Sequence, residues 1–318
     1  MTEICKETFN KAIYNSQSSA LAKSSRRLFF THCNLPIEEL GHWHADYFFS
    51  RGGSSTLIRF KNRFFLLTAK HVLKNNKILG EDGSTNFQNE SPLLAVAKAD
   101  RGWEELTSFL FPAKIWHIGE LIDNQNFLMN TKDIVLVELH LPSYDYLPDA
   151  FINLDNPETK RNIIVSDFFN NQILISSGYP TKTNEFIHEN IGDFTHKTYL
   201  NRKIIPGICV VEDNEPYISL ERTEGGNYEH DDIKGMSGGI VFNVQPETEQ
   251  INWCGLILTA GKNKIRFCPS RLILPAIERY DQASKTIVDP SVHLAPLCDT
   301  EQATESLGEL LEEMYKCT

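Results

Sequence analysis

Long apolar runs are missing from this sequence of 318 residues. A membrane-spanning helix needs about 20 predominantly apolar residues in a row, and no segment approaches that length. Residues 1–23 are polar and lack the apolar core and the small-residue cleavage site of a signal peptide. We therefore expect a cytoplasmic protein without a membrane partner.

Basic charge is also scarce, because 31 Lys and Arg residues face 42 Asp and Glu residues, which gives a net charge of −11. A chain this acidic offers no broad positive footprint for nucleic acid or for anionic lipid. Hydrophobic residues make up 41% and charged residues 23% of the chain. This balance predicts a folded core rather than disorder.

Paired cysteines are missing as well. The seven cysteines are an odd number, and none of them belongs to a C-x-x-C motif. They are Cys5, Cys33, Cys209, Cys254, Cys268, Cys298 and Cys317. Scattered free thiols are typical of a reducing compartment and argue against a disulfide framework.

What the sequence does contain, from Arg27 onward, is a series of short apolar runs with turn residues between them. This pattern predicts strands. In the first half we expect strands at residues 28–33, 54–60, 63–68, 93–99, 114–118 and 134–139. In the second half we expect them at residues 172–177, 203–211, 217–220, 239–243, 253–259 and 264–268. Two such sets favour either two antiparallel β-barrels or one large sandwich.

Apolar stripes at helical spacing lie in the C-terminal part, while the polar residues 1–25 are compatible with one short helix outside the main fold. Residues 271–282 place apolar side chains on one helical face despite Pro275. Residues 300–315 predict a second helix with an apolar stripe. That stripe either packs on its own domain or binds a partner.

The run Gly235-Met236-Ser237-Gly238-Gly239 lies between a charged segment and an apolar one. Only glycine accepts a positive φ without steric cost, so this run can turn sharply and leave backbone N–H groups free. A serine in such a turn has the setting of an acyl-transfer nucleophile beside an oxyanion hole. The same run is also compatible with a plain turn that joins two strands.

A nucleophilic serine needs a base and an acid that orients the base. His71 follows a predicted strand that ends at Thr68 and Ala69, which puts it at the rim of a sheet. Asp133 directly precedes a strongly apolar strand, where a carboxylate can be buried and hydrogen-bonded. Alternatively, His71 is a surface residue in a turn and Asp133 only caps its strand.

These residues carry a resemblance to a family. Leu-Thr-Ala-Lys-His at 67–71, Asp-Ile-Val-Leu at 133–136 and the glycine-serine run at 235–239 resemble the three catalytic motifs of chymotrypsin-like (trypsin-like) serine peptidases of the bacterial cytoplasmic type. Their order, His then Asp then Ser, differs from that of subtilisin and the α/β-hydrolases. The resemblance covers residues 27–282.

The resemblance implies an all-β fold of two antiparallel six-stranded β-barrels, with a closing C-terminal helix and an extra C-terminal helix. On that basis residues 1–26 form an N-terminal extension. Residues 27–145 form the first barrel, which carries His71 and Asp133, and residues 146–285 form the second, which carries Ser237. Residues 286–318 form a tail with the amphipathic helix.

The resemblance also implies catalytic roles. Ser237 is expected to be the nucleophile, His71 the general base, and Asp133 the residue that holds the imidazole in the useful tautomer. The backbone N–H groups of Gly235 and Ser237 are expected to form the oxyanion hole. Met236 stands where secreted members carry an aspartate that binds a newly cut N-terminus, so that activation switch is not expected here.

Substrate contacts are implied in the same way. Leu258, Thr259 and Ala260 match the strand that pairs with an extended substrate backbone. Asp231, six residues before Ser237, matches the position at which a buried carboxylate selects Lys or Arg at P1. The alternative is that Asp231 belongs to a solvated acidic loop.

A metal centre is the competing interpretation of four other residues. His32, Cys33, His42 and His44 are of the types that bind zinc, but their spacing matches no known pattern. We expect neither a metal nor another cofactor.

Together the motifs predict a serine endopeptidase that hydrolyses protein or peptide substrates through an acyl-enzyme intermediate. One alternative is a non-enzymatic peptide-binding or regulatory module on the same fold. Another is a latent peptidase that an activating protein partner switches on, because unrestrained proteolysis is harmful in a cytoplasm.

Overall fold

The fold was analysed in a computed structural model. It describes residues 6–30, 53–76, 78–80, 82, 94–97, 100–105, 109–123, 128–140, 150–158, 160, 167–184, 197–221, 228–245 and 250–288. Most described elements are strands, and the α-helices are short: α1 (Lys6–Ser16), α2 (Ala20–Ser24), α4 (Lys70–Asn75) and α6 (Ser270–Glu278). In the described part of the chain, no helix has the length and apolarity needed to cross a membrane.

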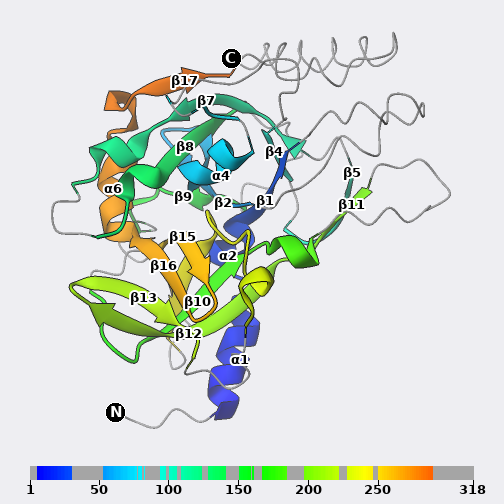
Figure 1. The fold of residues 1–318 in the computed structure, drawn as a ribbon, viewed down its shortest axis with the longest axis vertical. Helices are drawn as coiled ribbons and strands as arrows, with labels where there is room; N and C mark the ends of the chain where they lie inside the picture. Colours follow the sequence, from blue (N-terminus) through cyan, green and yellow to red (C-terminus); the bar gives the residue numbers. More distant parts are fainter. Residues whose placement is uncertain are drawn as a thin grey trace.

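The C-terminal half forms a closed antiparallel barrel in the strand order β10-β12-β13-β16-β15-β14. Its strands are β10 (Ile173–Gly178), β12 (Lys203–Glu212), β13 (Glu215–Ser219), β14 (Ile240–Val244), β15 (Ile251–Gly261) and β16 (Lys264–Pro269). Pairing of β10 with both β12 and β14 closes the ring. The predicted six-stranded barrel is therefore confirmed for this half, which occupies the lower part of the view in Figure 1.

The N-terminal half forms a nine-stranded sheet in the order β17-β7-β8-β3-β2-β1-β4-β6, with β9 added beside β2. Its strands are β1 (Ser25–Phe30), β2 (Ser54–Phe60), β3 (Arg63–Ala69), β4 (Leu94–Ala97), β6 (Phe109–Leu110), β7 (Pro112–Trp116), β8 (Ile134–Leu139), β9 (Ile152–Asn153) and β17 (Lys285–Ile287). Over the described ranges this is an open path of strands, so a second closed barrel is not shown. A separate ribbon pairs β5 (Gly102–Glu105) with β11 (Lys197–Leu200).

Tight turns with a sequence signature set the register of two hairpins. Lys61 and Asn62 both have positive φ between β2 and β3, and Asp213 and Asn214 do so between β12 and β13. Two residues with positive φ form the hairpin turn whose twist suits the flanking strands. The carboxylate of Asp155 accepts the N–H groups of Lys61 and Asn62, at 2.6 and 3.1 Å, and holds the first turn from outside the hairpin.

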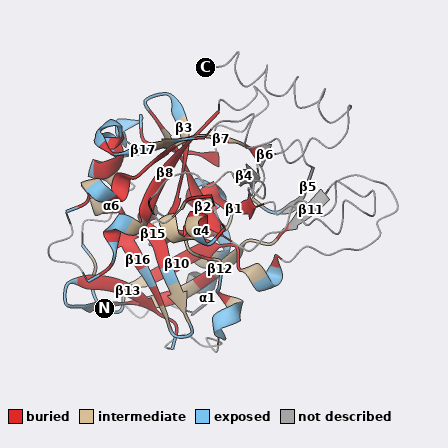
Figure 2. Ribbon diagram, turned by 45° about the horizontal axis from the view of Figure 1, so that its top comes forward, coloured by how far each residue is buried: buried red, intermediate tan, exposed pale blue. Residues whose placement is uncertain are grey.

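Two hydrophobic cores result, and β14 is buried on both faces, whereas β12 alternates between buried and half-buried residues (Figure 2). Successive side chains of a strand point to opposite faces. Leu174 accordingly belongs to the smaller core inside the barrel, while the next residue, Ile175, belongs to the larger core shared with the N-terminal sheet. The two halves are therefore joined by a continuous apolar layer.

The N-terminal segment differs from the predicted extension outside the main fold. Leu21 and Ala22 of α2 are buried in the larger core, and α2 contacts strands of both the sheet and the barrel. Ser25 and Arg26 already belong to β1, where they pair with β2. Residues 1–25 are mostly polar, so the short apolar pair Leu21 and Ala22 gave no recognisable pattern in the sequence.

Other segments cross the predicted domain boundaries. Residues 152–153 lie in the range assigned to the second barrel, yet β9 pairs with β2 of the N-terminal sheet. At the far end, β17 pairs with β7 of that sheet. Between them in the chain, α6 lies in the range 271–282 where the closing helix was expected. It packs against β15, β16 and the 3₁₀ turn η2 (Ile118–Leu121). The predicted helix at 300–315 lies outside the described residues.

Candidate active site

His71 lies in the first turn of α4, because that helix begins directly where β3 ends. The first N–H groups of a helix have no partner within the helix, and the N-cap residue Ala69 has no side chain that can accept one. The carboxylate of Asp133 fills this position: its Oδ1 accepts the backbone N–H of His71 at 2.7 Å. The polar start of the helix is thus satisfied by a residue 62 positions away.

Asp133 reaches His71 because of strand register. It is the last residue of the 3₁₀ turn η3 (Thr131–Asp133) and directly precedes β8. Strands β3 and β8 are antiparallel, and Ala69 lies opposite Ile134. The end of one strand and the start of the other therefore meet at one edge, which brings the two predicted residues together.

The second oxygen of this carboxylate sets the state of the imidazole. Asp133 Oδ2 lies 2.6 Å from His71 Nδ1. An ionised carboxylate only accepts hydrogen bonds, so Nδ1 carries the proton and the neutral ring keeps its lone pair on Nε2. The side chain of Asp133 is 16% exposed, whereas that of His71 is 35% exposed. The ring is thus accessible to a reacting group while its orienting acid is shielded.

Ser237 lies in a turn whose backbone requires glycine. Gly235 and Gly238 have φ values of +98° and +89°, a region that side chains disfavour. A Cβ atom on Gly238 would also come within 1.9 Å of the carbonyl oxygen of Ser54. The glycines on both sides of Ser237 are therefore demanded by geometry.

Backbone hydrogen bonds attach this turn to the barrel. Gly238 donates its N–H to the carbonyl of Ile257 at 2.7 Å, and Ile257 donates to the carbonyl of Gly239 at 2.8 Å. These bonds continue the pairing of β14 with β15, whose register ends at Ile240 and Leu256. The serine turn is thus an extension of a barrel strand rather than a free loop.

Ser54, the first residue of β2, links the serine turn to the sheet that carries His71. Its N–H donates to the carbonyl of Ser237 at 3.0 Å. Its hydroxyl donates to the carbonyl of Gly235 at 2.9 Å and accepts the N–H of Tyr179 at 2.8 Å. Its own carbonyl accepts the hydroxyl of Thr68 at 2.8 Å. The sequence predicts Ser54 as the first residue of a strand but gives no sign of this role.

The Lys234–Gly235 peptide is held in a defined orientation. The N–H of Thr181, in the 3₁₀ turn η5 (Thr181–Thr183), donates to the carbonyl of Lys234 at 2.8 Å. In a trans peptide the N–H points opposite to the carbonyl, so the N–H of Gly235 points away from Thr181. Within the described ranges, the N–H groups of Gly235 and Ser237 donate no hydrogen bond. Both donors predicted for the oxyanion hole are therefore available.

His71 and Ser237 do not hydrogen-bond to each other in the part of the chain that the structure describes. Such bonds are often long in a substrate-free site and tighten when substrate binds. The connection between the two residues runs instead through the backbone, from Ser237 to Ser54 and from β2 to β3.

The prediction that Asp231 is a buried pocket carboxylate is not supported, because its side chain is 75% exposed. It lies in the 3₁₀ turn η6 (His230–Asp232), where Asp232 instead pairs with Lys182 at 2.9 Å. The hydrogen bond from Lys182 lowers the pKa of Asp232. A water-exposed carboxylate is screened and cannot select a cation strongly, so Asp231 corresponds to the solvated-loop alternative.

The residues expected to bind substrate lie at the end of β15. Leu258 is buried, Thr259 is exposed and Ala260 is half-buried. The register with β16 shifts between Ile257 and Thr259, which indicates a bulge at Leu258. Past Ile257, no described strand pairs with β15 on the side of the serine turn.

The residues of the alternative metal site, His32, Cys33, His42 and His44, lie outside the described residues. Elsewhere, within the described ranges, no group of three or more His, Cys, Asp or Glu residues is placed to hold a metal ion. Comparison with known proteins adds no assignment, since no protein-family model and no curated protein matches this chain.

Proposed function

We propose that this chain is a serine endopeptidase of the chymotrypsin-like type, with Ser237 as nucleophile and His71 as base. The observation that carries the proposal is the Asp133 carboxylate, which accepts both the backbone N–H and the Nδ1–H of His71, at 2.7 and 2.6 Å. A base held in this tautomer is what activation of a serine hydroxyl requires. An aspartate that only capped its strand would not need to bind the imidazole.

The proposed reaction has two stages. Ser237 Oγ attacks the scissile carbonyl carbon while His71 Nε2 takes the hydroxyl proton, and the N–H groups of Gly235 and Ser237 bind the developing oxyanion. His71 then gives the proton to the leaving amine, which departs and leaves an acyl-enzyme. Water, deprotonated by His71, attacks the acyl carbon, the bond from this carbon to Ser237 Oγ breaks, and His71 returns the proton to Oγ as the acid leaves.

The proposal includes a fold of two barrels. Phe111 alone separates β6 from β7, so one run of chain pairs with β4 and also with β8. The carbonyl of Phe111 accepts the N–H of His140 at 3.0 Å, which continues the β7–β8 ladder through this residue. This continuity supports a curved N-terminal sheet whose strand order returns on itself.

A protein or peptide in extended form is the proposed substrate. Its backbone would pair with the edge of β15 at Leu258, Thr259 and Ala260, where β16 is the only partner strand among the described residues. Strand addition of this kind recognises backbone rather than a particular sequence. No cofactor takes part in the proposed chemistry.

A fluorophosphonate probe tests the proposal directly, because it reacts only with an activated serine. We expect the purified chain to be labelled at Ser237, and Ser237→Ala to abolish labelling. Ser18→Ala is the matched control, since Ser18 is exposed and far in sequence from the site. Absence of labelling of a folded wild-type chain, both alone and in a lysate, would overturn the proposal.

A non-enzymatic peptide-binding module on the same fold is the second candidate. The observation that favours it is the missing hydrogen bond between His71 and Ser237 within the described ranges. A module would bind extended peptides without cleaving them, so mass spectrometry of an unfolded protein substrate separates the two. Labelling in lysate but not of the purified chain would instead indicate a peptidase that a protein partner activates.

A further inference from the structure

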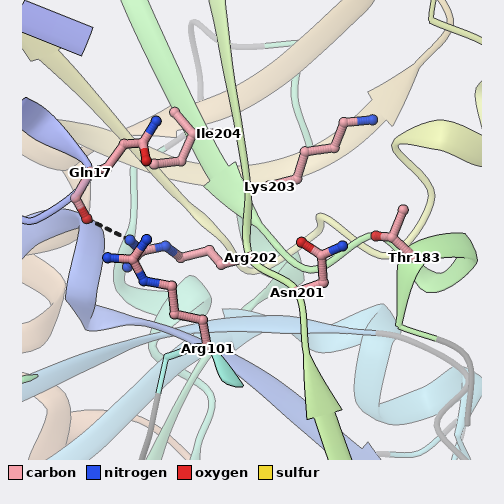
Figure 3. Close-up of a pocket in the computed structure, with 7 residues that line it drawn as sticks. All are labelled: Gln17, Arg101, Thr183, Asn201, Arg202, Lys203 and Ile204. Atoms are coloured by element: carbon pink, nitrogen blue, oxygen red, sulfur yellow. Dashed lines mark hydrogen bonds between the residues drawn. The ribbon is translucent and has the colours of Figure 1, made fainter. Parts of the chain in front are cut away.

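A polar cavity of about 270 Å³ lies where four segments meet, and none of its described lining residues belongs to the serine turn (Figure 3). Gln17 follows α1, Arg101 precedes β5 and Thr183 ends η5. Asn201 and Arg202 connect β11 with β12, and Lys203 and Ile204 begin β12. Among the described lining residues, Ile204 alone is aliphatic. Ligand cavities usually have volumes of about 300–1,000 Å³, so this one suits a small and polar molecule.

Positive charge gathers in this cavity against the overall sign of the molecule. Arg101, Arg202 and Lys203 line it, and the described lining contains no acidic residue. The chain as a whole carries a net charge of −11. Lys203 points away from the two arginines in Figure 3, and its Nζ lies 3.4 Å from the carbonyl of Asp232. The cation pair that faces the cavity is therefore Arg101 and Arg202.

Arg202 is rigidly held. Its side chain is 1% exposed, and Nη1 lies 2.6 Å from Oδ2 of Asp100. The guanidinium also donates to the backbone carbonyls of Ala22 and Gln17. A guanidinium has five N–H donors in a fixed plane, so these three acceptors do not use all the donors of Arg202, which lines the cavity.

Both signs of charge surround this guanidinium. Burial lowers the pKa of Arg202, Asp100 and Tyr179 raise it, and the nearby cations Arg101 and Arg26 lower it. Arg101 is exposed at the mouth of the cavity, so its side chain can reach a bound molecule. An anion between Arg101 and Arg202 would relieve the repulsion between them, as Coulomb's law requires.

The neutral wall of the cavity is ordered too. The side-chain amide of Asn184 donates to the carbonyl of Asn201 at 2.9 Å, and its oxygen accepts the N–H of Asn201 at 2.8 Å. These two hydrogen bonds between the segments fix the backbone from which Asn201 and Arg202 project. Gln17, Thr183 and Asn201 then present amide and hydroxyl groups to the same space (Figure 3).

From these observations we propose that the cavity binds a small phosphate monoester, with the phosphate between Arg101 and Arg202 and the polar remainder against Gln17, Thr183 and Asn201. Planar guanidinium groups match phosphate oxygens in pairs, which favours phosphate over a single carboxylate. The site is distinct from the serine turn, and the proposal does not depend on peptidase activity.

Isothermal titration with adenosine 5′-monophosphate and with inorganic phosphate tests the site, and adenosine serves as the probe without phosphate. We expect saturable one-to-one binding of at least one phosphate probe, with a Kd below about 1 mM, and none of adenosine. Affinity should fall as salt is added, since the contacts are ionic. No binding of either phosphate probe at about 1 mM, or equal binding of adenosine, would overturn the proposal.

Arg101→Gln and Arg101→Glu locate the binding. Arg101 is exposed, so both variants should unfold at the wild-type temperature, which a thermal melt checks. We expect Arg101→Gln to weaken phosphate binding by about tenfold or more and Arg101→Glu to abolish it. Lys262→Gln removes an exposed lysine from the hairpin between β15 and β16 and should leave binding unchanged. Unchanged phosphate binding in both Arg101 variants would contradict the assignment. So would tighter binding of malate, a dicarboxylate without phosphate, than of inorganic phosphate.

Discussion

At the scale of single residues, the carboxylate of Asp133 performs two tasks at once. It caps the first turn of α4 through the N–H of His71, and it holds Nδ1 of the ring. Both tasks need an acceptor, and an ionised carboxylate provides two oxygens that only accept. An asparagine has one such oxygen, so it cannot serve both donors.

The first prediction concerns this pair. Asp133→Asn should turn an N–H donor toward His71 Nδ1 and favour the wrong tautomer, which lowers the rate of Ser237 labelling by about 10⁴-fold. Stopped-time labelling with a fluorophosphonate measures this rate. Asp155→Asn is the matched control, because Asp155 also accepts two backbone N–H groups, but in the β2–β3 turn. Equal rates in Asp133→Asn and wild type would contradict the assigned role.

Ser54 provides the second prediction at this scale. Its hydroxyl joins the carbonyl of Gly235 to the N–H of Tyr179. Ser54→Ala leaves both groups without this partner, which should cost about 1–3 kcal/mol of stability. It should also slow Ser237 labelling, because the carbonyl of Gly235, two residues before the nucleophile, is then no longer held by Ser54.

Ser55→Ala is the matched comparison for Ser54→Ala. Ser55 is the next residue of the same strand and is equally buried, but its hydroxyl donates to the carbonyl of Arg26 at a longer 3.3 Å. Urea unfolding measures the stability of both variants, and the rate of Ser237 labelling measures their reactivity. We expect the larger loss of both in Ser54→Ala. Loss of stability without loss of labelling in Ser54→Ala would reduce Ser54 to a structural residue.

At the scale of elements, the serine turn depends on its glycines. Gly238→Ala would force a side chain into a backbone with φ of +89° and onto the carbonyl of Ser54. We expect loss of labelling and a lower unfolding temperature. Gly261→Ala is the control, since its added methyl would meet only the Lys264 carbonyl, at 3.7 Å. Normal labelling in Gly238→Ala would mean that the turn adopts another conformation.

The helix α2 supplies a second prediction for an element. Leu21 is 6% exposed and joins the larger core between sheet and barrel. Leu21→Ala should therefore reduce the free energy of unfolding by about 2–5 kcal/mol. Tyr14→Ala should change it by no more than about 0.5 kcal/mol, because Tyr14 on α1 is 74% exposed. If a urea titration gave equal changes for both variants, α2 would not be part of the hydrophobic core.

At the scale of the whole molecule, buried histidines link stability to pH. Burial lowers the pKa values of His117 and His140 below 6.5; Lys70 lowers the first further and Lys114 the second, while Glu120 and Glu138 oppose the shifts. The unfolded chain then binds more protons than the folded one at mildly acidic pH. Stability is therefore full above pH 6.5 and declines as the pH falls below it.

This dependence can be tested on His140, whose ring nitrogens have no hydrogen-bond partner within the described ranges. His140→Phe should flatten the decline in unfolding free energy between neutral and mildly acidic pH. His230→Phe should not, because the side chain of His230 is 63% exposed. Denaturant titrations across this pH range measure the slopes, and an unaltered slope in His140→Phe would refute the link.

Much of the secondary structure follows from sequence pattern. The expected strands at 54–60 and 134–139 agree with β2 and β8 at both ends. The strands β5, β6, β9, β11 and β17, by contrast, were not expected. Each of these strands is only two to four residues long. Most of them pair with strands far along the chain. A pattern of local periodicity carries no information about such partners.

The sequence by itself determined the order of the three motifs, the glycines around Ser237 and the strands that bring His71 and Asp133 to one edge. Each depends on local rules: positive φ, alternation and the run of apolar residues. Only the tertiary structure decided that Asp133 accepts two bonds from His71, that Ser54 holds the serine turn, and that Asp231 faces water. It also decided that Arg101 and Arg202 share a cavity. Such contacts join residues distant in the chain, and their geometry follows from how the sheet and the barrel pack together.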